Sequence, residues 1–309
     1  MKKMINKVTV EGLAYESKLA TKVSSKNGKE YIGGELFILT SEDNVVPVSF
    51  FEFKTTNAGA ENKKYADLLK LMSTMKTVLA DGKENATPLS IKSSNLTADE
   101  YSKDEQICSF AKQRGGFINV VPATKLNPKA TFENDVMIVN TIREIDSVSG
   151  EERPYLTVKA FIFNWANEII PMTFAVHNPK GIEYFENMAP NTFTKVWGNI
   201  VSLTVKTQKI TENAFGEALV EEVERTTKQW VITGTNTIAY DEEQMTVEEW
   251  QKCLANRQLK IADYIKAEKD RAMMKAQAQG QINTAPAQGA NNNGFGGFAA
   301  ATPAGGFNF

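Results

Sequence analysis

Two stretches of this chain match each other without a gap, and this internal repeat restricts the fold more than any other feature of the sequence. Residues 31–53 read YIGGELFILTSEDNVVPVSFFEF, and residues 155–177 read YLTVKAFIFNWANEIIPMTFAVH. Aromatic and proline positions recur in register at an offset of 124 residues, as in Tyr31 and Tyr155, Phe37 and Phe161, and Pro47 and Pro171. A repeat of this length is typical of a duplicated domain, so we expect two similar domains.

Each copy contains five segments with strand character and one short helical segment between the third and fourth. The expected strands are 6–16, 31–40, 45–54, 88–97 and 107–122 in the first copy, and 135–146, 155–165, 168–177, 199–210 and 220–234 in the second. The helical segments are 63–75 and 181–188. This order is that of the OB-fold, a small Greek-key barrel that binds oligonucleotides mainly on its second and third strands.

The chain changes character after the second copy. Thr246 and Glu249 form a capping box, and apolar residues follow at helical spacing, so one long helix is expected to about Gln279. Residues 280–309 are rich in glycine, asparagine and alanine, which predicts a disordered tail. The expected fold is therefore mainly β, with two tandem five-stranded OB-like barrels, a long α-helix and a disordered tail. The expected boundaries are 1–124 and 133–236 for the barrels, 125–132 for a linker, 237–279 for the helical segment and 280–309 for the tail.

One strand of the second copy carries an unusual set of side chains. If residues 153–165 form a β-strand, one face carries Leu156, Val158, Ala160 and Ile162. The other face carries four aromatic residues and Lys159. In an OB-fold that second face lines the binding groove, where bases stack on rings and cations contact phosphates. The nucleic-acid-binding residues expected on this basis are Tyr31, Phe37, Phe51, Phe53, Lys54 and Arg114 in the first copy, and Arg153, Tyr155, Lys159, Phe161, Phe163, Trp165, Lys206 and Lys228 in the second. The alternative is that loops, the other barrel or a second subunit cover these aromatics; Lys159 favours the groove, because a lysine is awkward in a dry core.

Composition restricts the function. The formal net charge is −2, so a nucleic-acid contact needs a local positive surface. His177 is the only histidine, Cys108 and Cys253 have no metal-ligand spacing, and no phosphate-binding glycine motif occurs. We therefore expect no enzyme activity, no catalytic residues, no cofactor and no metal. The sequence shows neither a signal peptide nor a stretch apolar enough to span a membrane, so a cytoplasmic protein without membrane contact is expected.

Two barrels, a helix and a tail together resemble single-stranded DNA-binding proteins, in particular those of bacteriophages. The resemblance implies single-stranded DNA as the partner, which the protein coats during replication or recombination in the cytoplasm of a bacterial host. It also implies that partner proteins dock on the tail, at Phe307 and Phe309, and the helix at 247–279 could hold subunits of an oligomer together. Two alternatives stay open: a phage structural or assembly protein with buried aromatic faces, and an RNA-binding protein of the same architecture.

Overall fold

The computed structural model describes residues 3–145, 150–212, 218–236 and 245–282, with side chains except at 203–226 and 278–282. The tail expected at 280–309 therefore lies almost wholly outside the described residues. Five strands build the first barrel: β1 (Asn6–Ser17), β3 (Glu30–Ser41), β4 (Asn44–Phe53), β5 (Pro88–Lys103) and β6 (Gln106–Arg114). Shorter elements join them: β2 (Ala20–Val23), α1 (Lys63–Thr74), α2 (Val78–Asp81) and β7 (Phe117–Val120).

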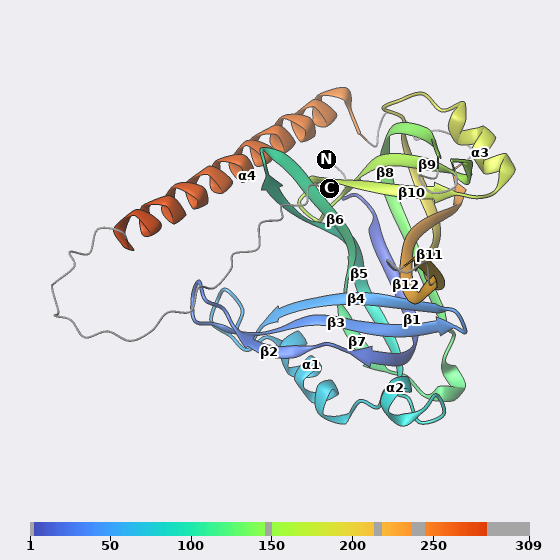
Figure 1. Cartoon of the computed structure of the whole chain (residues 1–309), viewed down its shortest axis with the longest axis vertical. Coiled ribbons are helices and arrows are strands. Elements are labelled where there is room, and N and C mark those ends of the chain that lie inside the picture. The colour runs from blue at the N-terminus through green and yellow to red at the C-terminus, as the bar shows by residue number, and fades with distance from the viewer. Residues whose placement is uncertain (1–2, 146–149, 213–217, 237–244, 283–309) are drawn as a thin grey trace. The chain divides into compact units, whose positions relative to one another are not determined.

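The first barrel closes in the order expected of an OB-fold. β1 pairs with β3, β3 with β4, β4 with β6, β6 with β5, and β5 again with β1. All of these pairs are antiparallel except β4 and β6, which meet in parallel through Ser49 and Arg114. The helix α1 follows the third barrel strand (Figure 1), as the sequence predicted, and the short helix α2 after it was not predicted. The OB-like fold of the first copy is thereby confirmed.

The second barrel repeats this topology. Its strands are β8 (Lys129–Ile145), β9 (Glu152–Phe163), β10 (Ile169–Val176), β11 (Phe193–Glu212) and β12 (Ala218–Thr235), preceded by the short helix η1 (Ala123–Lys125). They pair in the ring β8–β9–β10–β12–β11–β8, again with one parallel contact, between Ala175 and Val231. The helix α3 (Pro179–Glu186) lies between β10 and β11 in the chain. The strand order and pairing of the second copy therefore match those of the first.

Alternating burial along the strands explains how each barrel is held together. On β1 the side chains of Val8, Val10 and Ala14 are buried, while their neighbours are partly exposed. Two of the helices add apolar residues to this core: Tyr65, Leu68 and Leu71 from α1, and Ile182 and Phe185 from α3. Burial of this apolar surface is the main stabilising contribution to a small barrel.

The strand expected at 107–122 is two strands in the structure. β6 ends at Arg114 and β7 begins at Phe117, with Gly115 and Gly116 between them. A Cβ atom on Gly116 would lie 2.3 Å from the backbone oxygen of Lys92, and one on Gly115 would lie 2.3 Å from the ring of Phe50. Only glycine permits this close crossing, which lets β7 pair with the start of β5 and β6 with its end.

The two barrels are joined through their first strands. β1 and β8 pair in an antiparallel ladder from Asn6–Asn134 to Glu11–Lys129, so β8 begins inside the segment expected as a linker, and the two barrels share one continuous sheet (Figure 1). The Nδ2 of Asn44, the first residue of β4, donates to the backbone oxygen of Ile200 on β11 at 3.0 Å. Residues 1–265 form one compact unit. The boundaries 1–124 and 133–236 for separate domains stay a prediction.

The helix α4 (Val247–Ile282) confirms the capping box at its start. The Thr246 hydroxyl accepts from the Glu249 backbone at 3.2 Å, and the Glu249 carboxylate accepts from the Thr246 backbone at 3.0 Å. This backbone hydrogen bond lowers the pKa of Glu249. Trp250 and Cys253 then pack against Phe163 and its neighbours on the second barrel. Within the described part of the chain, no helix is both long and apolar enough to cross a membrane.

Candidate nucleic-acid interface

Three aromatic rings form an open cluster on the outer face of the first barrel. Tyr31 on β3 lies opposite Phe53 on β4, and Phe51 lies beside both. The ring centroids are 4.8 Å apart for Tyr31 and Phe51, 5.8 Å for Tyr31 and Phe53, and 5.1 Å for Phe51 and Phe53. The Tyr31 ring lies so close to Gly33 that a Cβ atom there would be 2.8 Å from it. The cluster presents aromatic surface to solvent, and Phe51 is 44% exposed.

A groove of about 950 Å³ runs beside this cluster. Tyr31 and Phe51 line it, and so do four basic residues: Lys22, Lys112, Arg114 and Lys228. Arg114 is held across the groove floor by a hydrogen bond of 3.2 Å from Nη2 to the backbone oxygen of Phe51. Lys112 forms an ion pair with Asp99. The groove therefore combines stacking surface with local positive charge in a protein of net negative charge.

The far wall of the groove comes from the β5–β6 hairpin. Phe110 on β6 is exposed and lines the groove, and its ring stacks on that of Tyr101 with a centroid distance of 5.9 Å and an interplanar angle of 14°. Lys112 follows Phe110 on the same strand at the alternating position. The hairpin thus adds a second aromatic surface to the groove that Tyr31 and Phe51 also line.

The second barrel contributes to the same groove. Lys228 and Trp230 of β12 line it, although they belong to the second copy of the repeat. Trp230 also lines a smaller groove of about 300 Å³, together with Lys159 and Phe161 on β9. The two grooves share Ser109, Ala111 and Trp230 along their common edge. They are therefore neighbouring grooves, one lined mainly by the first barrel and the other mainly by the second.

Trp230 lines both of these grooves. Its side chain is mostly buried, and its Nε1 has no hydrogen-bond partner among the described residues. Buried polar atoms in native proteins are nearly always paired, so the unpaired Nε1 of Trp230 is an exception. Trp230 therefore lies, with Ser109 and Ala111, where the two grooves meet.

The predicted aromatic face of β9 is not a single exposed surface. Lys159 is exposed and Phe161 is half-buried, and both line the smaller groove. The prediction that Phe163 is exposed is wrong, because this side chain is fully buried among Met137, Ile169 and Trp250. The physical reason is α4, whose first turns cover this end of the strand.

Tyr155 and Arg153 lie at the opposite end of β9 and do not line the groove. The Nη1 of Arg153 donates to the Tyr155 hydroxyl at 2.9 Å and to the Glu144 carboxylate at 2.7 Å. The Tyr155 ring also lies 5.0 Å from the ring of His177, an exposed histidine. The nucleic-acid contact predicted for Tyr155 and Arg153 stays a prediction, separate from the groove.

Five further predicted residues lie outside the groove lining or outside the described side chains, and one of them is Phe53 of the aromatic cluster. Phe37 faces Lys18, whose Nζ is 4.9 Å from the ring centroid, and Lys54 pairs with Glu30 at 3.2 Å. Glu30 also accepts a hydrogen bond from the hydroxyl of Tyr65, which lowers the pKa of the carboxyl group. Trp165 is 84% exposed in the turn after β9. Lys206 lies on β11, with its side chain outside the described part.

The docking residues expected in the tail, Phe307 and Phe309, lie outside the described residues. Within the described ranges, no group of three or more histidine, cysteine or acidic residues is placed to hold a metal ion.

Sequence reasoning missed Phe110 and Trp230, and both had a signal. Phe110, Lys112 and Arg114 alternate along one strand, which places an aromatic and two basic residues on one face. Lys228 and Trp230 repeat that spacing in the second copy. The nearness of Lys228 and Trp230 to the first barrel had no local signal, since it arises from the packing of the two barrels.

Comparison with known proteins gives one family and several solved structures. A family model described as YorF matches residues 4–267. No curated protein matches the sequence. The wild-type single-stranded DNA-binding protein from Thermus aquaticus is similar with a TM-score of 0.46 and 9% identity, over 78% of this chain and 96% of that chain.

Two further solved structures are similar. A deletion mutant of the Thermus aquaticus protein has a TM-score of 0.44 and 11% identity, over 78% of this chain and 98% of that one. A Replication Protein A heterotrimer bound to ssDNA has a TM-score of 0.20 and 8% identity, over 81% of this chain and 52% of that chain. At these TM-scores and identities, the fold assignment rests on the strand pairing described above.

Proposed function

The chain belongs to the YorF family, and we propose that it binds single-stranded DNA with little sequence preference. The observation that carries the proposal is a lining of aromatic and basic side chains from both barrels, in two neighbouring grooves. Phe51, Phe110 and Phe161 supply ring surface along them, while Lys228 and Lys159 supply positive charge. Stacking of a base on such a ring contributes about 1–3 kcal/mol whatever the base, so the groove accepts many sequences.

The aromatic lining of the groove favours a single strand over a duplex. Stacking requires that the flat face of each base be free, and in a duplex that face is occupied by the neighbouring base pairs. The basic residues contact the phosphates, so the affinity falls as the salt concentration rises. The acidic groups in the groove, Glu35 and Asp99, restrict the positions at which a phosphate can lie.

The proposed setting is the replication or recombination of DNA, with a bacteriophage as the setting that the sequence resemblance implies. In that setting the protein coats single strands, and Phe307 and Phe309 serve as docking residues for partner proteins. A truncation that removes residues 283–309 tests the docking role, because it is expected to abolish partner capture while it leaves DNA affinity within about twofold.

The experiment that tests the binding is a titration of a fluorescent oligo(dT) of about 30 nucleotides, a length that covers two barrels at about 4–16 nucleotides each. The expected result is tight binding that weakens with salt and that duplex DNA of equal length does not displace. An RNA oligonucleotide of the same length is the second competitor, and stronger competition by RNA would make RNA the ligand of the groove. Absence of binding at micromolar protein, together with a stable oligomer, would replace the proposal with the assembly-protein alternative.

A further inference from the structure

The β5–β6 hairpin extends beyond the first barrel. Its strands pair with each other from Asn95–Arg114 to Lys103–Gln106, whereas β1 and β7 pair only with residues 88–94 of β5. Asp104 and Glu105 form the turn, both with positive φ. Because barrel pairing does not hold the outer part of the hairpin, its position must be fixed by other contacts. That position matters, since the hairpin carries Phe110 and one wall of the groove.

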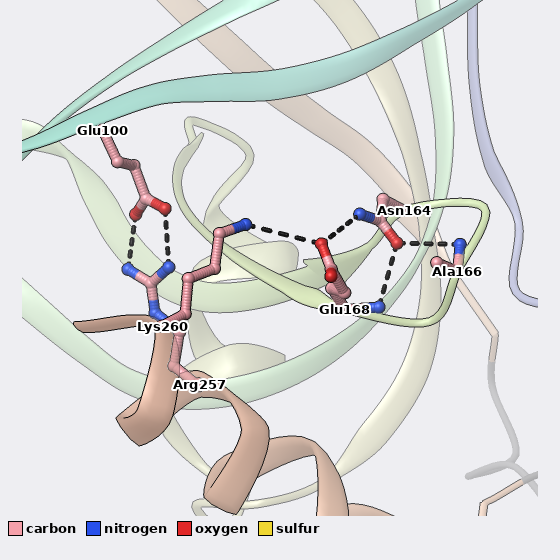
Figure 2. A network of polar contacts seen from close by, with 6 residues as sticks. All are labelled: Glu100, Asn164, Ala166, Glu168, Arg257 and Lys260. Atoms are coloured by element: carbon pink, nitrogen blue, oxygen red, sulfur yellow. Dashed lines mark hydrogen bonds and ion pairs between the residues drawn. The ribbon is translucent and has the colours of Figure 1, made fainter. Parts of the chain in front are cut away.

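One such contact is an ion pair with α4. The Nη1 of Arg257 donates to Glu100 Oε2 at 2.6 Å, and Nη2 donates to the other carboxylate oxygen (Figure 2). The side chains are almost fully removed from solvent, with 9% exposure for Arg257 and 4% for Glu100. A bidentate guanidinium–carboxylate pair fixes both distance and orientation, and burial makes the loss of one partner costly.

The other end of this link is fixed to the second barrel. Trp250 of α4 packs on Phe161 and Phe163, and the Cys253 thiol donates to the backbone oxygen of Asn167 at 3.5 Å. Lys260 pairs with Glu168 at 3.4 Å in the same β9–β10 turn. Figure 2 shows Arg257 and Lys260 leaving the helix toward different partners, the hairpin and the turn.

The β9–β10 turn is itself well held. The Asn164 side chain accepts from the backbone of Ala166 and Glu168, each at 2.9 Å, and its Nδ2 donates to the Glu168 carboxylate at 2.8 Å. The start of α4 therefore packs on the β9–β10 turn of the second barrel, while Arg257 binds the outer part of the β5–β6 hairpin of the first barrel.

We propose that Glu100 and Arg257 are positioning residues, which hold the hairpin so that the two halves of the groove form one path for a single strand. The inference rests on the proposed function and adds that the Glu100–Arg257 ion pair aligns the strand-binding contacts of the two barrels. Neither residue lines the groove, so neither touches the strand directly.

The physical consequence is a gain in affinity that depends on strand length. When two half-sites are held in line, binding to the first raises the effective concentration for the second, and the combined affinity rises by about 100-fold or more. When the hairpin is released, the half-sites lose their alignment and a long strand gains little over a short one. A strand that fits one half-site loses only the contacts that the hairpin itself makes, so its affinity falls less than that of a long strand.

The experiment compares two fluorescent oligo(dT) probes, of about 8 and about 30 nucleotides, which match one and two half-sites. The wild-type chain is expected to bind the longer probe at least about 100-fold more tightly. In Glu100→Gln and in Arg257→Gln this ratio is expected to fall below about tenfold, because the affinity for the longer probe falls more than the affinity for the shorter probe. The matched control is Lys252→Gln, which removes the charge of an exposed lysine on the same helix and is expected to keep the full ratio.

A charge-reversed double variant, Glu100→Arg with Arg257→Glu, is expected to restore the ratio, and it carries the test if a single variant fails to fold. A ratio unchanged in the single variants, or an equal loss of affinity for both probes, overturns the positioning role. A wild-type chain that binds both probes equally overturns this role alone. A wild-type chain that binds neither probe overturns the proposed function itself.

Discussion

The indole ring of Trp250 lies against the phenyl ring of Phe161, with the two centroids 5.9 Å apart. This contact places the start of α4 on the strand face where the sequence predicted a stacking surface. The equivalent phenylalanine of the first barrel, Phe37, lies beside Lys18 instead. The repeated barrels therefore present different faces, and the groove draws on the open face of the first barrel and only part of the second.

Replacement of Trp250 by alanine is expected to release α4 from the second barrel. Truncation of a buried tryptophan costs about 3–5 kcal/mol, and a loss of about 3 kcal/mol raises the undocked population about 100-fold. The rate of alkylation of the buried Cys253 measures that population in a Cys108→Ser background. Val247→Ala, an exposed change in the same helix, is the control and is expected to leave the rate unchanged. An unchanged rate in Trp250→Ala would show that Trp250 does not hold the helix.

The docking of α4 is also expected to depend on pH through Cys253. Burial, and then the charge of Glu249, raise the pKa of this thiol above its ordinary value. The docked state therefore retains its proton to higher pH than the undocked state, and docking is at full strength below about pH 8.5. Docking is expected to weaken as the pH rises through and above that value. Hydrogen exchange of α4 amides, corrected for intrinsic rates, measures the change, and Cys253→Ala should remove it.

Phe51→Ala is expected to weaken binding of oligo(dT) by about 5- to 150-fold, the equivalent of about 1–3 kcal/mol for one stacked base. The control is Phe117→Ala, because Phe117 is as exposed as Phe51, 45% against 44%, but lies outside the groove lining. Thermal unfolding of both variants checks that the fold is retained. Equal losses of affinity in the two variants would argue against a stacking role for Phe51.

Lys228→Gln is expected to reduce the salt dependence of binding. A phosphate contact with single-stranded DNA contributes about 0.7 to the slope of log affinity against log salt concentration. The slope of the variant is therefore expected to be shallower by about that amount, measured by titration at several salt concentrations. Lys70→Gln, an exposed lysine change on α1 outside the groove, should leave the slope as it is. A slope that is the same in all three proteins would remove Lys228 from the phosphate contacts.

Gly116→Ala is expected to destabilise the first barrel by about 1–3 kcal/mol, the usual cost of forcing extra atoms into a packed site. The new Cβ atom would meet backbone oxygens of Lys92 and Ser93, which cannot move aside as a side chain can. Urea unfolding measures the free energy of unfolding. Gly28→Asn is the matched control, since Gly28 has open space and a positive φ that asparagine tolerates. A Gly116 variant as stable as the control would contradict the crossing described here.

The sequence by itself determined the architecture. The gapless repeat implied two similar domains, the order of strands and one helix indicated the OB-fold, and Thr246 with Glu249 located the start of α4. These features are local: strand alternation, helical spacing and capping each depend on residues a few positions apart. The break at Gly115 and Gly116 was missed because its cause, the backbone of Lys92, lies far away in the chain.

Only the tertiary structure decided which parts of the predicted surface are open. Alternation on β9 places Lys159, Phe161 and Phe163 on one face, but it cannot say that α4 covers Phe163. Nor does the sequence indicate that Lys228 and Trp230 of the second barrel line the groove of the first. The pairing of Arg257 with Glu100 likewise has no signal in the sequence. Periodicity reports which side chains share a face, whereas what covers a face depends on packing between segments more than 100 residues apart.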